Sequence, residues 1–476
     1  MERIYFDKQI FSYLFKCKEP AYQEFLESLY KNKHRFLYCY SHGHLLDLKN
    51  DLTGIKYEEL NFIETLVNDN YLLYNAIEKK TSCYLAKPNE AFKDIEQDEP
   101  ISFSNLFEDI NFEFATPEQK VKVELAKEVL YKQKLDLGLS QFDAFPESLS
   151  EPLKKILPIG LGSMSIVEWM EHFMGMVKVM EEDKSIYKSL RNVVDQNINN
   201  GKFTVDYESI DFNEDLKNSV LQKTFIEYVN NNLNPDGDKE VTVYDFYVNA
   251  YFMLDLLGIS KEPSKTVKFK NVMNDGYHSY YGAFCDYVVS DDNGFLKKTK
   301  VLYKLLGIET KVYHIDQFIP FFNLIANSFE ADINTFLELL VNDLRNGLVL
   351  DIFNSIKSNR NTTVIKPYHQ YLGYFNRIEY IKENGSDYIL LRRETKNYSN
   401  FSFYRQYEGV INNAIRLFGI DSDFIGEFNW VKEIKEINEG QWNGRFWNFG
   451  TLTTLIEINK VINEFCLLIT PKKETE

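Results

Sequence analysis

The chain has 476 residues, of which 44% are hydrophobic and 26% charged, so it has enough apolar surface to fold as roughly three globular domains. Its 71 acidic and 54 basic residues give a net charge of −17, the opposite of what a non-specific nucleic-acid coat protein needs. No apolar run approaches the ~18 residues of a membrane span, and charges replace an apolar signal core at the N-terminus, so we expect a cytoplasmic protein with no membrane partner.

The N-terminal segment alternates between expected strands and helices. Ile4–Phe6 is a short apolar run that ends on Asp7, and a second run, Arg35–Tyr40, ends on Ser41. The hydroxyl of Ser41 can cap a helix that carries Asp47. This order of elements indicates the first part of an α/β domain.

The middle of the chain is expected to be mostly helical. Thr116–Glu118 is a helix start, with a capping hydroxyl, a proline at the first position and an acid in the first turn. Apolar stripes predict helices over Ile166–Met180 and Leu216–Val229, and Tyr244–Leu257 is apolar nearly all round. We therefore predict that residues 80–264 form a mainly α-helical insertion.

Alternating elements return between residues 265 and 320. The expected order is helix, strand, helix and strand, over Asp275–Phe284, Asp286–Ser290, Phe295–Leu306 and Thr310–His314. Helices and strands that alternate through short links are typical of a parallel α/β sheet.

The remaining residues, 321–476, predict a C-terminal α+β domain. Asn334–Phe353 has a helical pattern. Tyr371–Ile381 and Asp387–Arg393 have strand patterns, and the Asn-Gly pair in Glu383–Ser386 predicts a hairpin between them, because it tolerates positive φ.

Carboxylates follow the strands of both α/β segments, where a parallel sheet places its active site. Asp7 follows the first strand, and Asp47 lies on the helix after the second. Asp275 opens the helix before the third strand, and Asp291 and Asp292 follow that strand. Converging carboxylates raise one another's pKa unless cations lie between them, and oxygen ligands in this number suit Mg²⁺ or Mn²⁺. Such a site can lower the pKa of a bound water and align it with a phosphodiester.

These residues resemble the PIN-domain nucleases. The segment DGYHSYYGAFCDYVVSDDNGF, which begins at Asp275, resembles the closing half of that family: an aspartate, a nearby histidine, small helix residues, and an apolar strand that ends Ser-x-Asp before an aromatic. The segment IYFD around Asp7, followed by Phe11, resembles the opening strand. The segment YSHGHLLDL around Asp47 resembles the second acidic helix.

The resemblance implies a PIN-like parallel sheet flanked by helices and split by the insertion, with its halves at residues 1–79 and 265–320. It implies that the catalytic, metal-binding acids are Asp7, Asp47, Asp275 and Asp292, with Asp291 as a supporting or substitute metal ligand and Ser290 as an orienting residue. Two departures distinguish the chain from the family. Lys8 and Gln9 stand where small polar residues are common, and the second acid is an aspartate in place of the longer glutamate.

A locally basic stretch surrounds the closing motif. Residues 261–304 hold eight lysines and five acids, in a chain that is acidic overall. Lys268 and Lys270 precede the strand that ends at Ser290, and Lys297 and Lys298 follow it, so they predict a short nucleic-acid track. The alternative is a solvated helix face.

The sequence thus predicts an endonuclease that uses Mg²⁺ or Mn²⁺ to hydrolyse phosphodiester bonds, with single-stranded RNA as the expected substrate. Two alternatives stay open: a catalytically weak PIN-like binding protein and a DNA-directed nuclease. The insertion or the C-terminal domain would serve any protein partner. A site exists only if the strand that ends at Asp7 lies beside, and parallel to, the strand that ends at Ser290.

Overall fold

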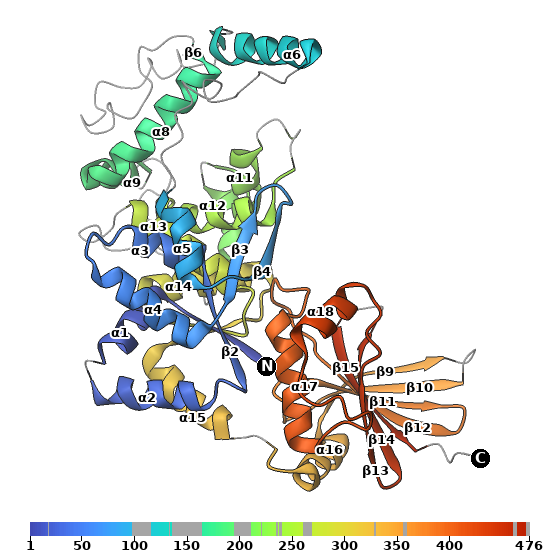
Figure 1. Cartoon of the computed structure of the whole chain (residues 1–476). Coiled ribbons are helices and arrows are strands. Elements are labelled where there is room, and N and C mark those ends of the chain that lie inside the picture. Colours follow the sequence, from blue (N-terminus) through green and yellow to red (C-terminus); the bar gives the residue numbers. More distant parts are fainter. Residues whose placement is uncertain are drawn as a thin grey trace. The chain divides into compact units, whose positions relative to one another are not determined.

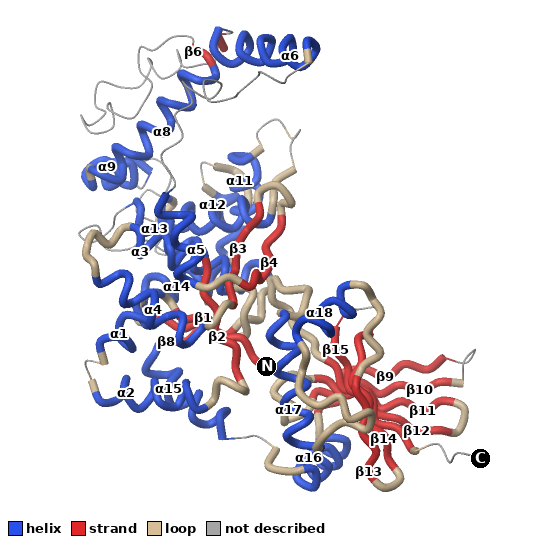
Figure 2. Tube along the Cα trace, in the orientation of Figure 1, coloured by secondary structure: helices blue, strands red, loops and turns tan. Residues whose placement is uncertain are grey.

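The structure is a computed structural model that describes residues 1–17, 19–97, 116–132, 134–135, 164–194, 211–219, 221–234, 237, 240–259, 269–327, 330–355, 359–459 and 464–472. It divides into two compact units (Figures 1 and 2). The first unit comprises Met1–Lys93 and Tyr277–Glu476, and the second comprises Asp94–Gly276. None of the helices in the described ranges combines the length and the apolar character that a membrane span needs.

A six-stranded sheet forms the centre of the N-terminal part of the first unit, in the order β4-β3-β2-β1-β7-β8. Its strands are β1 (Glu2–Phe6), β2 (Phe36–Ser41), β3 (Asn70–Asn75), β4 (Lys80–Leu85), β7 (Tyr287–Ser290) and β8 (Lys311–His314). β1 is parallel to both of its neighbours, and Tyr5 lies opposite Cys39 of β2 and Val288 of β7. The predicted parallel pairing of the strands that end at Asp7 and Ser290 is therefore confirmed.

One edge of this sheet differs from the expected all-parallel arrangement. β4 runs antiparallel to β3, with Asn75 opposite Lys80, so the sheet is mixed. The short link between these strands explains the difference, because only antiparallel neighbours can be joined without a crossover connection. β4 also carries the sheet to Leu85, beyond the expected end of the first half at residue 79.

Helices cover both faces of the sheet because its strands are apolar on both sides. In the first unit they are α1 (Lys8–Lys16), α2 (Pro20–Lys31), α3 (His42–Lys49), α4 (Ile55–Val67), α14 (Asn293–Leu306) and α15 (Ile315–Asn327), with the end of α13 (Phe269–Gly282); α5 (Pro88–Gln97) crosses the boundary between the units. On one face, Phe6 packs edge-to-face against aromatic rings of α1, α2 and α15. Tyr5, on the other face, contacts His44 of α3 and His278 of α13.

The second unit is mostly helical in its described residues. Its elements are α6 (Pro117–Lys127), a π-helical turn (Glu128–Lys132), β5 (Lys134–Leu135), β6 (Met164–Ser165), α8 (Ile166–Glu182), α9 (Lys184–Val194), α10 (Phe212–Asp215), a 3₁₀ turn (Leu216–Asn218), α11 (Phe225–Leu233) and α12 (Val243–Leu256), followed by the first part of α13. The predicted continuous helix Leu216–Val229 is wrong. The chain breaks there, and the hydroxyl of Thr224 accepts a hydrogen bond from the Glu227 N–H at 3.0 Å, which starts a new helix at Phe225.

A seven-stranded antiparallel sheet forms the C-terminal part of the first unit, in the order β13-β14-β15-β12-β11-β10-β9. Its elements are α16 (Ile333–Asn346), β9 (Leu348–Ser355), β10 (Arg360–Lys366), β11 (Arg377–Glu383), β12 (Ser386–Arg392), α17 (Tyr404–Phe418), α18 (Trp430–Asn438), β13 (Arg445–Phe449), β14 (Leu452–Asn459) and β15 (Glu464–Pro471). Asn384 and Gly385 both have positive φ between β11 and β12, so the predicted hairpin is confirmed.

Two expectations for this part are corrected. The helix predicted over Asn334–Phe353 ends at Asn346, and the rest of that run is β9. The helix gives way at Gly347, where an added Cβ would lie 2.5 Å from both the Asp343 carbonyl oxygen and the Ile365 side chain. In addition, α15 runs through Pro320, so the expected boundary after residue 320 falls inside a helix.

A buried cluster of charged groups joins the two sheets of the first unit. Arg393, at the end of β12, donates from Nη2 to both oxygens of Asp286 at 2.8 and 2.7 Å. The Arg3 N–H donates to Asp286 at 2.7 Å, and the Arg3 guanidinium donates to Gln406 of α17. Burial acts to raise the pKa of Asp286, but the charges of Arg393 and Arg3 outweigh it and the pKa is lowered. The carboxylate is thus charged and compensated on both sides.

We expect Asp286→Asn to destabilise the protein by about 3–5 kcal/mol, because it leaves two buried guanidinium groups without their shared counter-charge. Chemical denaturation at neutral pH measures the loss. Glu309→Gln is the matched control. It removes an acid from the exposed pair Lys396–Glu309, whose side chains are 63% and 60% exposed, and we expect a change below about 1 kcal/mol. Equal losses in the two variants would contradict the anchoring role of Asp286.

Candidate functional site

The carboxyl ends of β1 and β7 bring Asp7, Ser290 and Asp292 together. The Asp7 N–H donates to the Val289 carbonyl at 2.9 Å, which continues the ladder between the two strands. The Ser290 hydroxyl donates to Oδ2 of Asp7 at 2.7 Å and accepts from the Asp292 N–H at 3.0 Å. A single buried hydroxyl therefore orients the Asp7 carboxylate and ties it to the loop after β7.

Burial is the strongest influence on the ionisation of Asp7, and charged neighbours act on it in both directions. Burial raises the pKa of Asp7, and the charges of Asp47 and Asp292 add to this effect, while the charge of His278 and the hydrogen bond from Ser290 oppose it. The net result is a raised pKa. The carboxylates of Asp7, Asp47 and Asp292 are thus close enough to repel one another, which a bound cation would relieve.

Asp47 is held by a chain of buried polar groups. Its Oδ2 lies 2.9 Å from Nε2 of His278, a side chain that is 1% exposed. Nδ1 of His278 lies 2.7 Å from the Tyr5 hydroxyl, which in turn lies 2.7 Å from the Ser41 hydroxyl. Burial lowers the pKa of His278, but the hydrogen bond and charge of Asp47, together with the charge of Asp7, outweigh it and the pKa is raised.

His44 has a structural role in the same region. Its Nδ1 accepts a hydrogen bond from the Ser41 N–H at 3.0 Å, so Nε2 carries the hydrogen that is donated to the Phe6 carbonyl at 2.7 Å. Burial and the charge of His278 hold the pKa of His44 well below its ordinary value. His44 is therefore neutral and locks the end of β1 to the start of α3.

Asp292 and Asp291 are engaged by protein groups. Asp292 is the N-cap of α14, and its Oδ1 accepts from the N–H groups of Gly294 and Phe295 at 2.6 and 2.9 Å. Oδ2 of Asp291 accepts from the Tyr13 hydroxyl at 3.0 Å, and its Oδ1 lies 3.1 Å from Nε2 of His314. Each oxygen of Asp291 thus already has a protein partner.

Sequence reasoning missed the contacts of Tyr13 and His314 with Asp291. A signal for His314 exists in the sequence, because it ends the strand beside β7 and so lies at the same sheet edge as Asp291. Tyr13 lies 278 residues from Asp291, and no local pattern connects them.

The other predicted site residues are placed differently. Asp275 and Lys270 lie on the part of α13 that belongs to the second unit, whereas Asp7, Asp47 and Asp292 belong to the first. Lys268 lies outside the described residues. Lys297 is exposed on α14, but Lys298 is fully buried and does not present its ammonium group to solvent, as a phosphate-binding lysine must.

The described carboxylates fit a cation in part. Across the ranges that the structure describes, no group of three or more His, Cys, Asp and Glu side chains has the geometry of a formed metal site. In the same ranges Oδ1 of Asp7 and Oδ2 of Asp292 make no hydrogen bond, which leaves one oxygen of each acid for a ligand.

Comparisons with protein-family models, curated proteins and solved structures found no match to this chain.

We expect Asp7→Asn to stabilise the fold in metal-free buffer, increasingly so as the pH rises. A raised carboxyl pKa favours the protonated form in the folded state, so the wild type loses stability as the pH rises through the window above the ordinary aspartate value near 4. A tenfold difference in proton affinity between the folded and unfolded states corresponds to about 1.4 kcal/mol. Urea denaturation of the variant and the wild type at pH 5 and pH 8 measures the difference.

Asp51→Asn is the control of opposite sign. The Thr53 N–H donates to Asp51 at 2.8 Å, and hydrogen bonding from Thr53 lowers the pKa of Asp51. The Asp51→Asn variant should therefore lose stability relative to the wild type as the pH rises. If Asp7→Asn behaves in the same way, the Asp7 carboxylate is not destabilised by burial and neighbouring acids.

We also expect the imidazole of His278 to titrate above 6.5 in the folded protein, and Asp47→Asn to lower its pKa. Protonation of His278 stabilises the fold, so this stabilisation is complete below the unfolded value near 6.5 and is lost as the pH rises through the folded value. NMR titration of the imidazole signals with a chelator present measures both values. His44, as the internal control, should stay neutral throughout. An unchanged His278 titration in Asp47→Asn would show that Asp47 is not its partner in solution.

Proposed function

We propose that this chain is a PIN-like, metal-dependent endonuclease that hydrolyses phosphodiester bonds in RNA. The observation that carries the proposal is the Ser290 hydroxyl, which joins the Asp7 carboxylate to the main chain of Asp292 beyond the carboxyl ends of two adjacent parallel strands. The charges of Asp47 and Asp292 both act on Asp7. A parallel sheet binds ligands at this edge, and mutually repelling carboxylates there favour a divalent cation.

Asp7, Asp47 and Asp292 would hold Mg²⁺ or Mn²⁺. When bound, the cation would lower the pKa of a water and offset charge on the phosphate. The protein groups position these acids. Ser290 fixes the Asp7 carboxylate, and His278, held by the Tyr5 hydroxyl, fixes Asp47.

Exposed Lys297 remains a candidate for a phosphate contact, while buried Lys298 is removed from the proposed track. Single-stranded RNA is the proposed substrate, and a DNA substrate uses the same chemistry. Competition between RNA and DNA oligonucleotides of equal length separates the two.

A second candidate is a catalytically weak PIN-like protein that binds a partner. The N-cap role of Asp292 and the double engagement of Asp291 favour it, because both reduce the oxygens available to a cation. Thermal stability measured against Mn²⁺ separates the candidates, since a ligand that binds only the folded state stabilises it.

We expect Asp7→Asn to reduce Mn²⁺-dependent cleavage of single-stranded RNA by at least about 100-fold while the protein stays folded, because one ligand and its charge are lost. Cleavage of a labelled oligonucleotide with Mn²⁺ and with chelator measures it. Asp316→Asn is the control, since the Asp316 side chain, 83% exposed, follows β8 at the same sheet edge. Equal activity of the Asp7→Asn variant and the wild type would overturn the nuclease assignment.

A further inference from the structure

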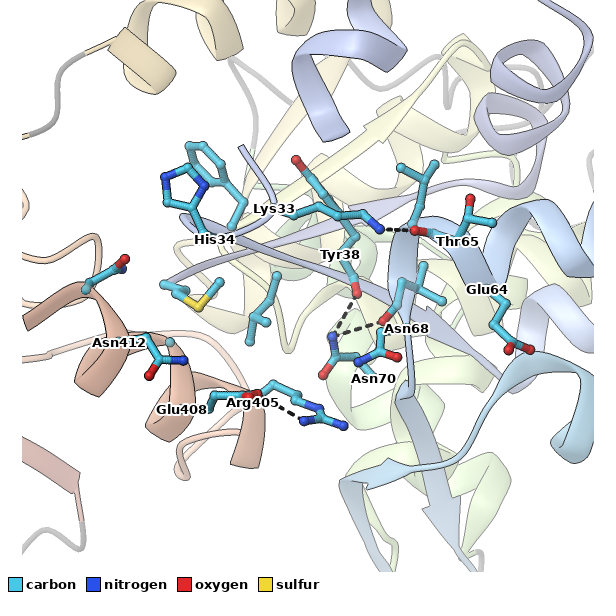
Figure 3. A pocket seen from close by; sticks show the side chains of 17 residues that line it. Lys33, His34, Tyr38, Glu64, Thr65, Asn68, Asn70, Arg405, Glu408 and Asn412 are labelled. Atoms are coloured by element: carbon cyan, nitrogen blue, oxygen red, sulfur yellow. Dashed lines mark hydrogen bonds and ion pairs between the residues drawn. The ribbon is translucent and has the colours of Figure 1, made fainter. Parts of the chain in front are cut away.

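The lysine and the arginine that line the pocket beside α17 already have protein partners (Figure 3). The ammonium group of Lys33 contacts the Thr65 carbonyl. Arg405 donates to both oxygens of Asp69 at 2.9 and 2.6 Å, and to Glu408 at 3.0 Å. A different surface of the first unit is open, within the described residues: the edge of the C-terminal sheet at β9.

β9 is an edge strand that exposes apolar side chains on both of its faces. Within the described part of the chain it pairs with one strand, β10. All eight residues of β9 are exposed. Five of them are large and apolar, with exposed fractions of 45–59%: Leu348, Val349, Leu350, Ile352 and Phe353. Successive side chains of a strand point to opposite faces, so apolar surface is open on both sides of β9.

The opposite edge of the same sheet is covered by a loop. The Ser422 N–H donates to the Phe446 carbonyl of β13 at 2.8 Å, and the Asn448 amide donates to the Ser422 hydroxyl at 3.2 Å. The edges of the N-terminal sheet, β4 and β8, each begin with a lysine, a residue that discourages pairing with another strand. An open, apolar edge such as β9 is instead a template for a further strand.

We propose that β9 pairs with β9 of a second copy of this chain, so that two seven-stranded sheets join about a two-fold axis. The partner strand must also be apolar on both faces, and β9 itself meets this requirement. Large apolar side chains expose on the order of 200 Å² each when free, so five half-exposed ones present roughly 500 Å² per copy. The pair would bury roughly 1,000 Å², the size that a specific interface needs. The proposal does not depend on nuclease activity.

The charge of Asp351 selects the register of this pairing. Main-chain N–H and C=O groups alternate in direction along a strand, so two copies pair with one residue opposite its own copy at the axis. The middle of β9 offers Asp351 or Ile352 for this position. Two carboxylates directly opposite each other are destabilising, which excludes Asp351. An axis at Ile352 sets Asp351 opposite Phe353.

The main chain at Ile352 is consistent with this axis. In the single chain the Ile352 N–H donates to Oδ1 of its own neighbour, Asp351, at 2.8 Å. Its acceptor is therefore a side chain of the same strand. Pairing about Ile352 would offer this N–H a main-chain carbonyl of the second copy.

The test is sedimentation of the full-length chain from low to high micromolar concentration, in salt that screens its net charge of −17. We expect a reversible equilibrium between monomer and dimer. Ile352→Lys should weaken dimerisation at least tenfold, because it sets two ammonium groups opposite each other. Its melting temperature in dilute solution should stay near that of the wild type. Ile77→Lys, the control, makes the same change at a 94% exposed side chain in the β3–β4 turn and should dimerise like the wild type.

A mixture of the Ile352→Lys and Ile352→Glu variants tests the two-fold symmetry. Each variant alone should be monomeric at concentrations where the wild type is dimeric, and the mixture should restore the dimer because opposite charges then face each other. A wild-type chain that stays monomeric throughout overturns the proposal and leaves β9 to an extended segment of another protein. A dimer that Ile352→Lys does not weaken, or a mixture that stays monomeric, overturns self-pairing through β9.

Discussion

The half-buried carboxylate of Asp286, which compensates the buried guanidinium groups of Arg3 and Arg393, is the constraint on which the first unit depends. It stands just before β7, receives the main-chain N–H of Arg3 from β1, and forms a two-oxygen pair with Arg393 from the C-terminal sheet. Removing a charge from water is costly unless its partners are fixed. The N-terminal strands and the C-terminal sheet must therefore pack together correctly before Arg3 and Arg393 can be buried in their charged forms.

This anchor acts at one end of the strands, and the candidate site lies at the other. The register that sets Tyr5 opposite Val288 also delivers Asp7 to the Ser290 hydroxyl, because β1 is only five residues long. The position of this short strand is fixed by its pairing with both neighbours.

Local patterns in the sequence were sufficient for much of this fold. The Asn384-Gly385 hairpin and the Thr116 cap depend only on residues within one turn. The pairing of β1 with β7 was predicted for a different reason: the acids that follow the two strands can form one site only if they lie at the same edge of the sheet. The end of α16 was missed because the restriction at Gly347 comes partly from Ile365, on another strand.

In the candidate site, too, residues at strand ends could be predicted from local sequence, whereas contacts between distant segments could not. Asp7 and Ser290 were identified from strand ends, but the partner of Asp47, His278, lies 231 residues away. The burial of Lys298 could have been anticipated, because it stands three residues after Phe295 and four before Leu302, on the apolar stripe of α14. An aspartate in a turn sequence can cap the following helix as well as bind a metal. The structure shows that the Asp292 side chain caps α14.

The separation of β1 and β7 in the chain has a consequence for synthesis. β1 and β2 leave the ribosome early, but β7 follows about 250 residues after β2, and Arg393 about a hundred residues after β7. Until then one edge of β1 stays open, Ser290 has not reached Asp7, and the buried anchor has no cation. The growing chain thus carries Asp7 and Asp47 without the groups that organise them. Assembly of the site is deferred until most of the protein has been made.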